Sequence, residues 1–266
     1  MNTLSLSAII IYTIAAISQI RLLLQNVTIT SQKHLLLLLG TTAFILHGIL
    51  LYQNILTTQG INLGFFNSAS LIAWVIVMLL LLSLPQKPVD NLIIFLFPLA
   101  ALTIGLDYVF QTERLLSSGQ LGVNIHIISS ILAYSLLTIS ALQSLFLAVQ
   151  EQRLHNHHPG WIIQRLPPLQ VMETLLLQLI ELGVLLLTIS LITGALFLEN
   201  IFQQHLIHKT VLSTIAWGIY MILLWGRWQY GWRGKVLIRW NLIGFLMLML
   251  AYFGSKLVLE LILHRQ

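Results

Sequence analysis

Residues 166–197 read LPPLQVMETLLLQLIELGVLLLTISLITGALF. The apolar part of this stretch, residues 172–198, is long enough to cross the ~30 Å hydrocarbon core of a bilayer as a helix. The proline pair fits the first helical turn, where the missing N–H of proline costs nothing. A helix from Pro168 to Leu198 would be about 46 Å long at ~1.5 Å per residue. We therefore expect its first turns to lie along the membrane interface.

Seven further segments have the same length and apolar character. Because a backbone in lipid must satisfy its own hydrogen bonds, we expect all of them to be helices. The alternation of apolar and polar residues that a membrane β-barrel needs is absent. Short connections favour one bundle, so the sequence predicts an all-α, polytopic membrane helix bundle of about eight transmembrane helices, with a single membrane domain over residues 1–266. The seven segments are 4–24, 34–53, 64–84, 92–110, 124–149, 209–226 and 237–262.

The composition supports lipid as the main solvent. Hydrophobic residues make up 58% of the chain and charged residues 8%, whereas a soluble domain carries about 25% charged residues. Cysteine is absent, which excludes disulfides, thiolate metal sites, cysteine nucleophiles and a thioether link to haem through this chain. The net charge of +5 is not gathered on a soluble face, so the basic residues indicate contact with membrane lipid rather than nucleic acid.

The distribution of Lys and Arg predicts the topology, because cytoplasmic connections carry the excess of these residues. The odd-numbered connections hold nine Lys and Arg residues and the opposite side holds four. Both termini, and the histidine-bearing stretch 199–210, are then expected outside the cytoplasm. The nine residues are Arg21, Lys33, Lys87, Arg153, Arg165, Arg227, Arg233, Lys235 and Arg239.

Histidines gather toward the outer side in this topology. His126 opens the fifth segment, His208 opens the seventh with His205 just before it, His264 closes the eighth, and His47 lies within the second. Imidazoles at the edge of an apolar cavity can ligate haem iron, and two of them from different helices can form a bis-histidine pair. The alternative is that these histidines lie at helix ends, where they contact water and bind no ligand.

Other polar residues give little sign of chemistry. Asp107 near the outer end of the fourth segment and Glu181 near the inner end of the sixth could each relay protons. They lie on opposite sides with no carboxylates between them, which argues against an ion transporter. No nucleophile elbow, acid–base pair or phosphate-binding glycine loop is present, so we do not expect an enzyme. Trp217 and Trp225 are expected to pack within the bundle.

Three blocks together resemble the cytochrome c assembly family of haem-handling membrane proteins, and within it the small eight-span CcsA/HemX-like branch. One is a histidine-bearing span with an Ala-Tyr pair, IHIISSILAYSLLTISALQSLFLAVQEQRL (residues 125–154). The second is residues 166–197, quoted above. The third, residues 208–265, contains GWRG (231–234) and a span ending near YFG (252–254). The resemblance covers residues 120–264 well and the first half more loosely.

The resemblance implies a multi-pass protein of the bacterial inner membrane that presents haem on the outer face. Its axial ligands would be two outer histidines: His126 matches the first, and His264, or else His208, stands for the second. His47 would line the path that haem follows below these axial ligands. The implied function is non-catalytic haem handling in cytochrome c assembly or haem homeostasis. Haem and other cytochrome c assembly or haem-pathway proteins would be the partners.

Three departures from the family pattern keep a second hypothesis open. No tryptophan lies between Gly194 and Lys209, where the family has a tryptophan-rich loop, and His208 with Lys209 replaces an acidic run. Trp225 stands where the family has a histidine within the membrane. The alternative is a non-haem regulatory or assembly partner that kept the fold and lost the cofactor. A small-solute transporter is the least favoured function.

Overall fold

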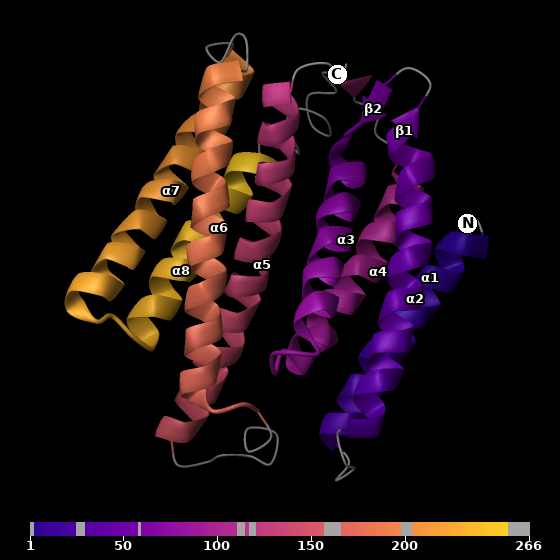
Figure 1. Cartoon of the computed structure of the whole chain (residues 1–266), viewed down its shortest axis with the longest axis horizontal. Helices are drawn as coiled ribbons and strands as arrows, with labels where there is room; N and C mark the ends of the chain where they lie inside the picture. The colour runs from indigo at the N-terminus through magenta and orange to yellow at the C-terminus, as the bar shows by residue number, and fades with distance from the viewer. Residues whose placement is uncertain are drawn as a thin grey trace. The chain divides into compact units, whose positions relative to one another are not determined.

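The structure, a computed structural model, describes residues 3–24, 30–57, 60–110, 115–116, 121–156, 166–197 and 204–254. Long helices dominate these residues (Figure 1). A short 3₁₀ turn, η1 (Asp90–Leu92), precedes α4, and a π-helical turn, η3 (Leu250–Gly254), follows α8. The long helices are α1 (Thr3–Leu24), α2 (Thr30–Ile55), α3 (Phe65–Ser83), α4 (Ile93–Val109), α5 (Leu121–His155), α6 (Leu169–Phe197), α7 (Gln204–Tyr230) and α8 (Lys235–Met249).

Eight helices in the described ranges are long and apolar enough to cross a membrane, which confirms the predicted all-α membrane fold. Their outer faces expose large apolar side chains such as Leu38, Leu82 and Ile192, as expected of surfaces that contact lipid. The side of the membrane on which the termini lie stays a prediction.

Several helix bounds differ from the predicted apolar segments, and α5 and α8 show this clearly. α5 continues to His155 rather than ending at residue 149, because the polar residues that follow the apolar run, such as Gln150 and Glu151, also favour helix. The predicted span 237–262 begins as α8, ends as a π turn at Gly254, and its remainder lies outside the described residues. α6 begins at Leu169, directly after the proline pair.

Contacts among the helices divide the chain into two compact units. The first unit comprises Met1–Ser118 with Gln164–Leu166, and the second comprises Gly119–Ile163 with Pro167–Gln266. The second unit begins beside residue 120, where the closer family resemblance begins. The single membrane domain over residues 1–266 stays a prediction.

In the first unit, α1 packs on α2 and α4, and α3 packs on the same two helices. Tyr12 of α1 is fully buried, and its ring meets the edge of Phe97 of α4 at 5.3 Å. Trp74 of α3 stacks on Phe44 of α2 at 4.6 Å and donates its indole N–H to the Phe44 carbonyl at 2.9 Å. Aromatic side chains therefore join the four helices in two pairs, α1 with α4 and α2 with α3.

A small antiparallel sheet lies beside the helices of the first unit. Its strands are β1 (Leu56–Thr57), β2 (Gly60–Asn62) and β3 (Leu115–Leu116), in the order β1-β2-β3. Gly60 has φ 141°, which a residue with a side chain rarely adopts. The sequence did not predict this sheet, because strands of two or three residues carry no readable alternation.

In the second unit, α5 and α6 run side by side, α8 packs on α5, and α7 packs on α6 and α8 (Figure 1). Asn241 of α8 is fully buried and joins α8 to α5. Its Nδ2 donates to Ser144 Oγ at 2.8 Å, and its Oδ1 accepts from Ser140 Oγ at 3.1 Å. Since these polar groups satisfy one another, they fix the register of α8 against α5.

Close packing of α5 on α6 depends on Gly183, where an added Cβ would lie 2.8 Å from Cγ and Cδ2 of Leu137. We expect Gly183→Val to lower the free energy of unfolding by about 2 kcal/mol, because overpacking forces the helices apart. Gly218 of α7 has nothing within 4 Å of the corresponding position, so Gly218→Val is the matched control. Denaturant unfolding in detergent measures both variants, and equal effects would contradict the packing argument.

Candidate functional site

His126, in the second turn of α5, is held by the backbone of α6. Its ring Nδ1 lies 2.8 Å from the carbonyl oxygen of Ser190. A carbonyl oxygen can only accept, so Nδ1 carries the proton and donates it. The other ring nitrogen, Nε2, therefore keeps an available lone pair in the neutral ring. Nε2 forms no hydrogen bond with the residues that the structure describes.

This arrangement is the one that metal-ligating histidines share: one ring nitrogen donates to a carbonyl or carboxylate, which fixes the tautomer and the ring orientation. Serine hydroxyls brace the contact. Ser130 Oγ lies 2.6 Å from Ser190 Oγ, and Ser190 Oγ lies 3.4 Å from His126 Nδ1. His126 itself is half-buried, so its ring is oriented by the protein while part of it remains accessible.

A cation and two aromatic rings, carried by α7, η3 and α5 itself, lie at the same end of the second unit. Lys209, near the start of α7, interacts electrostatically with His126. Its Nζ also lies over the ring of Tyr252 in η3, 4.6 Å from the centroid. Tyr252 in turn packs on Tyr134 of α5 at 5.2 Å, and the Tyr134 hydroxyl donates to the Leu248 carbonyl at 2.9 Å.

We call these four residues, His126, Lys209, Tyr134 and Tyr252, the His126 cluster. Tyr252 belongs to a π-helical turn, a departure from α-helix that is frequent at functional sites. The cluster offers an imidazole lone pair, a positive charge and aromatic faces. Together these groups suit a flat ligand that carries a metal and a carboxylate.

Sequence reasoning found His126 but missed its partners. Ser190 is 64 residues away, and its contact uses a backbone carbonyl, which no side-chain motif reveals. Tyr134 and Tyr252 stood in the Ala-Tyr and YFG motifs, but nothing in the sequence paired them.

The other outer histidines are placed only in part. His205 and His208 belong to the first turns of α7, and Lys209 of the cluster directly follows His208. The structure does not describe the side chains of these two histidines. His264 falls within residues 255–266, which are not described. Within the described residues, no three His, Cys, Asp or Glu side chains gather as a metal site.

His47 lies in the first unit and is fully buried. Its Nε2 is 2.9 Å from Ser70 Oγ, and its Nδ1 is 3.5 Å from the Tyr12 hydroxyl. Both ring nitrogens therefore have protein partners, and the residue links α1, α2 and α3. Its role in lining a haem path stays a prediction, and these contacts favour a structural role.

Asp107 is buried at the end of α4 among amides that the sequence did not connect with it. Asn54 Nδ2 donates to Asp107 Oδ2 at 2.9 Å. Oriented to satisfy its neighbours, the Asn67 amide donates to Asp107 Oδ1 at 2.8 Å and to Oδ2 at 3.2 Å, and accepts from Asn62 Nδ2 at 3.1 Å. We call these four residues the Asp107 cluster; it satisfies the carboxylate without a basic side chain.

The two tryptophans predicted to pack within the bundle behave differently. Trp217 is half-buried and donates its indole N–H to Thr188 Oγ1 of α6 at 2.9 Å, as expected. The prediction for Trp225 was wrong: its side chain is 54% exposed and meets the edge of Tyr230. Trp225 lies near the end of α7, where aromatic side chains favour the membrane interface.

Comparison with known proteins gives one family. The family described as "Cytochrome C assembly protein" matches residues 35–263. The chain is 32% identical over 233 residues to "Inner membrane protein YpjD" of Escherichia coli strain K12, covering 86% of this chain and 88% of that protein. It is 24% identical over 131 residues to "Protein HemX" of Brevibacillus brevis, covering 48% of each. No solved structure matches the chain.

Proposed function

Because this chain belongs to the cytochrome c assembly family and is a multi-pass inner-membrane protein, we propose that it binds haem at the His126 cluster, with His126 as an axial ligand. The observation that carries the proposal is the hydrogen bond from His126 Nδ1 to the Ser190 carbonyl. It holds the ring in the tautomer whose Nε2 can bind iron.

The rest of the cluster fits the other parts of a haem. The ring of Tyr252, which packs on the buried Tyr134, offers aromatic surface in a chain that lacks the tryptophan-rich loop of the family. The Lys209 ammonium offers a counter-charge for a propionate. Bound haem would supply an iron that changes redox state, and the residues of this chain would position it and set the local polarity.

A second axial ligand would come from His208 or His264. The start of α7 is at the same end of the unit as His126, since Lys209 interacts with His126. This position supports His208, and the family resemblance supports His264.

The function we infer is non-catalytic: the chain would hold or present haem in cytochrome c assembly or haem homeostasis, together with other proteins of those pathways. A haem chaperone needs only modest affinity and axial ligands that select a redox state.

The experiment is an absorption spectrum of the full chain purified from cells supplied with haem. We expect a Soret band that shifts on reduction and a haem content approaching one per chain. A preparation without a Soret band, from a monodisperse and folded protein, would overturn haem binding. It would favour the second candidate, a non-haem assembly partner, which the lack of tryptophan between Gly194 and Lys209 supports.

A further inference from the structure

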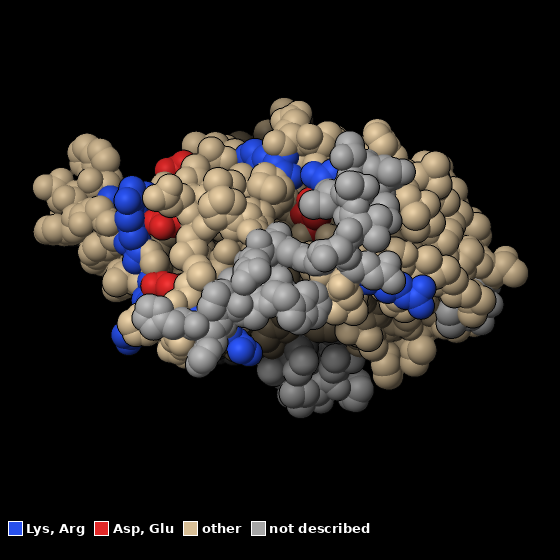
Figure 2. All heavy atoms as spheres, turned by 90° about the horizontal axis from the view of Figure 1, so that it is seen from below, with Lys and Arg blue, Asp and Glu red and all other residues tan. Residues whose placement is uncertain are grey.

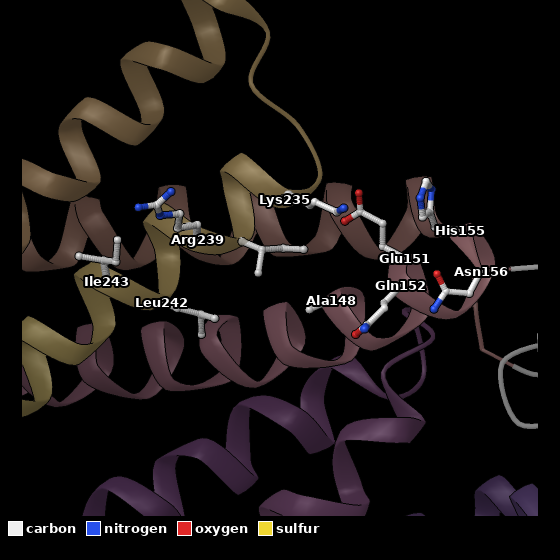
Figure 3. Close-up of a pocket in the computed structure, with 10 residues that line it drawn as sticks. Ala148, Glu151, Gln152, His155, Asn156, Lys235, Arg239, Leu242 and Ile243 are labelled. Carbon is white, nitrogen blue, oxygen red and sulfur yellow. The ribbon is translucent and has the colours of Figure 1, made fainter.

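A groove separate from the His126 cluster lies at the opposite end of α5, where α8 begins. Its volume is about 640 Å³, and its lining comes from the last turns of α5 and the first turns of α8 (Figure 3). One part of the lining is charged and the other is apolar. The charged residues are Glu151, Lys235 and Arg239, and the apolar ones include Ala148, Leu242 and Ile243.

The two basic residues of the groove are Lys235 and Arg239. Lys235 and Arg239 lie one turn apart on α8, both are exposed, and neither forms a hydrogen bond or ion pair with the residues that the structure describes. By contrast, Arg227 at the same end of the unit binds Glu173 at 3.3 Å and the Trp232 carbonyl at 2.9 Å. Figure 2 looks at the molecule from below and shows Lys and Arg side chains beside acidic ones on that face.

At the position of Arg239, a charge without a hydrogen bond or ion pair is unfavourable in free energy. Arg239 lies one turn inside a helix that crosses the membrane, and a charge at that depth needs a counter-ion or contact with the headgroup layer. Figure 3 shows the Lys235 ammonium and the Glu151 carboxylate pointing toward one another across the groove. If these two charges balance, the charge of Arg239 remains, and a single phosphodiester would neutralise it.

The apolar part of the lining indicates that the ligand is an amphiphile rather than a simple anion. Leu242 and Ile243 continue along α8 from Arg239, away from the charged end. A free anion would leave this surface uncovered, whereas an acyl chain would cover it. The first turn of α8 has no side-chain cap, so its free N–H groups add a partial positive charge near Lys235.

We propose that this groove binds one anionic phospholipid, with its phosphodiester at Arg239 and Lys235 and an acyl chain along Leu242 and Ile243. The site is independent of haem. Glu151 limits the affinity, because it adds a negative charge to the same groove.

The test is native mass spectrometry of the full chain, with retained lipid counted after exchange into detergent containing phosphatidylglycerol or phosphatidylethanolamine. We expect phosphatidylglycerol to be retained preferentially. Arg239→Gln should weaken its retention about fivefold, the effect of one basic residue near anionic lipid. Glu151→Gln should strengthen it by a similar factor. Arg239→Lys should keep it.

Arg153→Gln is the matched control, because Arg153 is an exposed basic residue of the same helix end that does not line the groove. It should leave retention unchanged. Equal loss in Arg153→Gln and Arg239→Gln would overturn the site, and so would retention of phosphatidylethanolamine equal to that of phosphatidylglycerol. Displacement of the lipid by millimolar inorganic phosphate would reveal a free-anion site and overturn the lipid assignment. Arg239→Lys reports on the charge if Arg239→Gln fails to fold.

Discussion

Replacing His126 with alanine is expected to lower the haem content of the purified protein about tenfold or more. Even loss of an outer partner of a metal-bound histidine costs ~10–100-fold in affinity, so loss of the ligand itself should cost at least as much. His126 Nδ1 is committed to the Ser190 carbonyl, so Nε2 is the only ring nitrogen that can reach iron. The measurement is the Soret absorbance per protein after growth with haem.

His155→Ala is the matched control for this experiment. His155 is an exposed histidine of the same helix, at its other end, so its loss should leave the Soret band unchanged. His126→Gly in the presence of imidazole should recover part of the band, because free imidazole can take the vacated ligand position. An unchanged band in His126→Ala would refute His126 as a ligand. The same measurement on His208→Ala and His264→Ala identifies the second ligand.

Replacing Asp107 with alanine is expected to lower the free energy of unfolding by about 3 kcal/mol or more. Asp107 is 8% exposed, and its carboxylate accepts hydrogen bonds from the side chains of Asn54 and Asn67. Its removal leaves these amide N–H groups without an acceptor, and each unsatisfied buried group costs ~1–3 kcal/mol. Since the Asp107 cluster joins α2, α3 and α4, the loss should weaken the whole first unit. Denaturant unfolding in detergent is the measurement.

Glu181→Ala provides the comparison for Asp107. Glu181 is also a carboxylate within a membrane-spanning helix, but it is exposed and forms no hydrogen bond or ion pair with the described residues. Its removal should change the free energy of unfolding by less than about 0.5 kcal/mol. A similar loss for both variants would mean that the Asp107 cluster does not stabilise the fold through its hydrogen bonds. The loss of unfolding free energy in Asp107→Asn should lie between the losses in the two alanine variants, because the side-chain carbonyl oxygen of asparagine can still accept a hydrogen bond.

The helices could be predicted because length and apolarity alone specify a membrane span. Residues 166–197 show this well: the proline pair predicted the start of the helix, and α6 begins at Leu169. The small sheet could not be predicted, since it pairs Ile61 with Leu116 across more than fifty residues and its strands are too short to show a period. The polar continuation of α5 to His155 was missed because hydropathy ends before the helix does.

The site was predictable only at the level of single residues. The position of His126 near the start of a span indicated a ligand, but the tautomer that makes it one depends on the carbonyl of Ser190 in a different helix. The contacts of Asp107 depend in the same way on the relative rotation of three helices. Patterns within one sequence report which face of a helix is apolar, but they do not report which atoms of two helices meet.

The length of α5 separates the two proposed sites by the thickness of a membrane. From His126 to Glu151 the helix rises about 38 Å at ~1.5 Å per residue, which is more than the ~30 Å hydrocarbon core and close to the ~40–45 Å that includes both headgroup layers. We therefore expect each proposed site to lie at an aqueous boundary, one per leaflet. A large polar cofactor could therefore dock beside His126 from water without dissolving in oil. Growing the cells on shorter acyl chains, which make the hydrocarbon core thinner, would test whether the length of this helix is matched to the thickness of the bilayer.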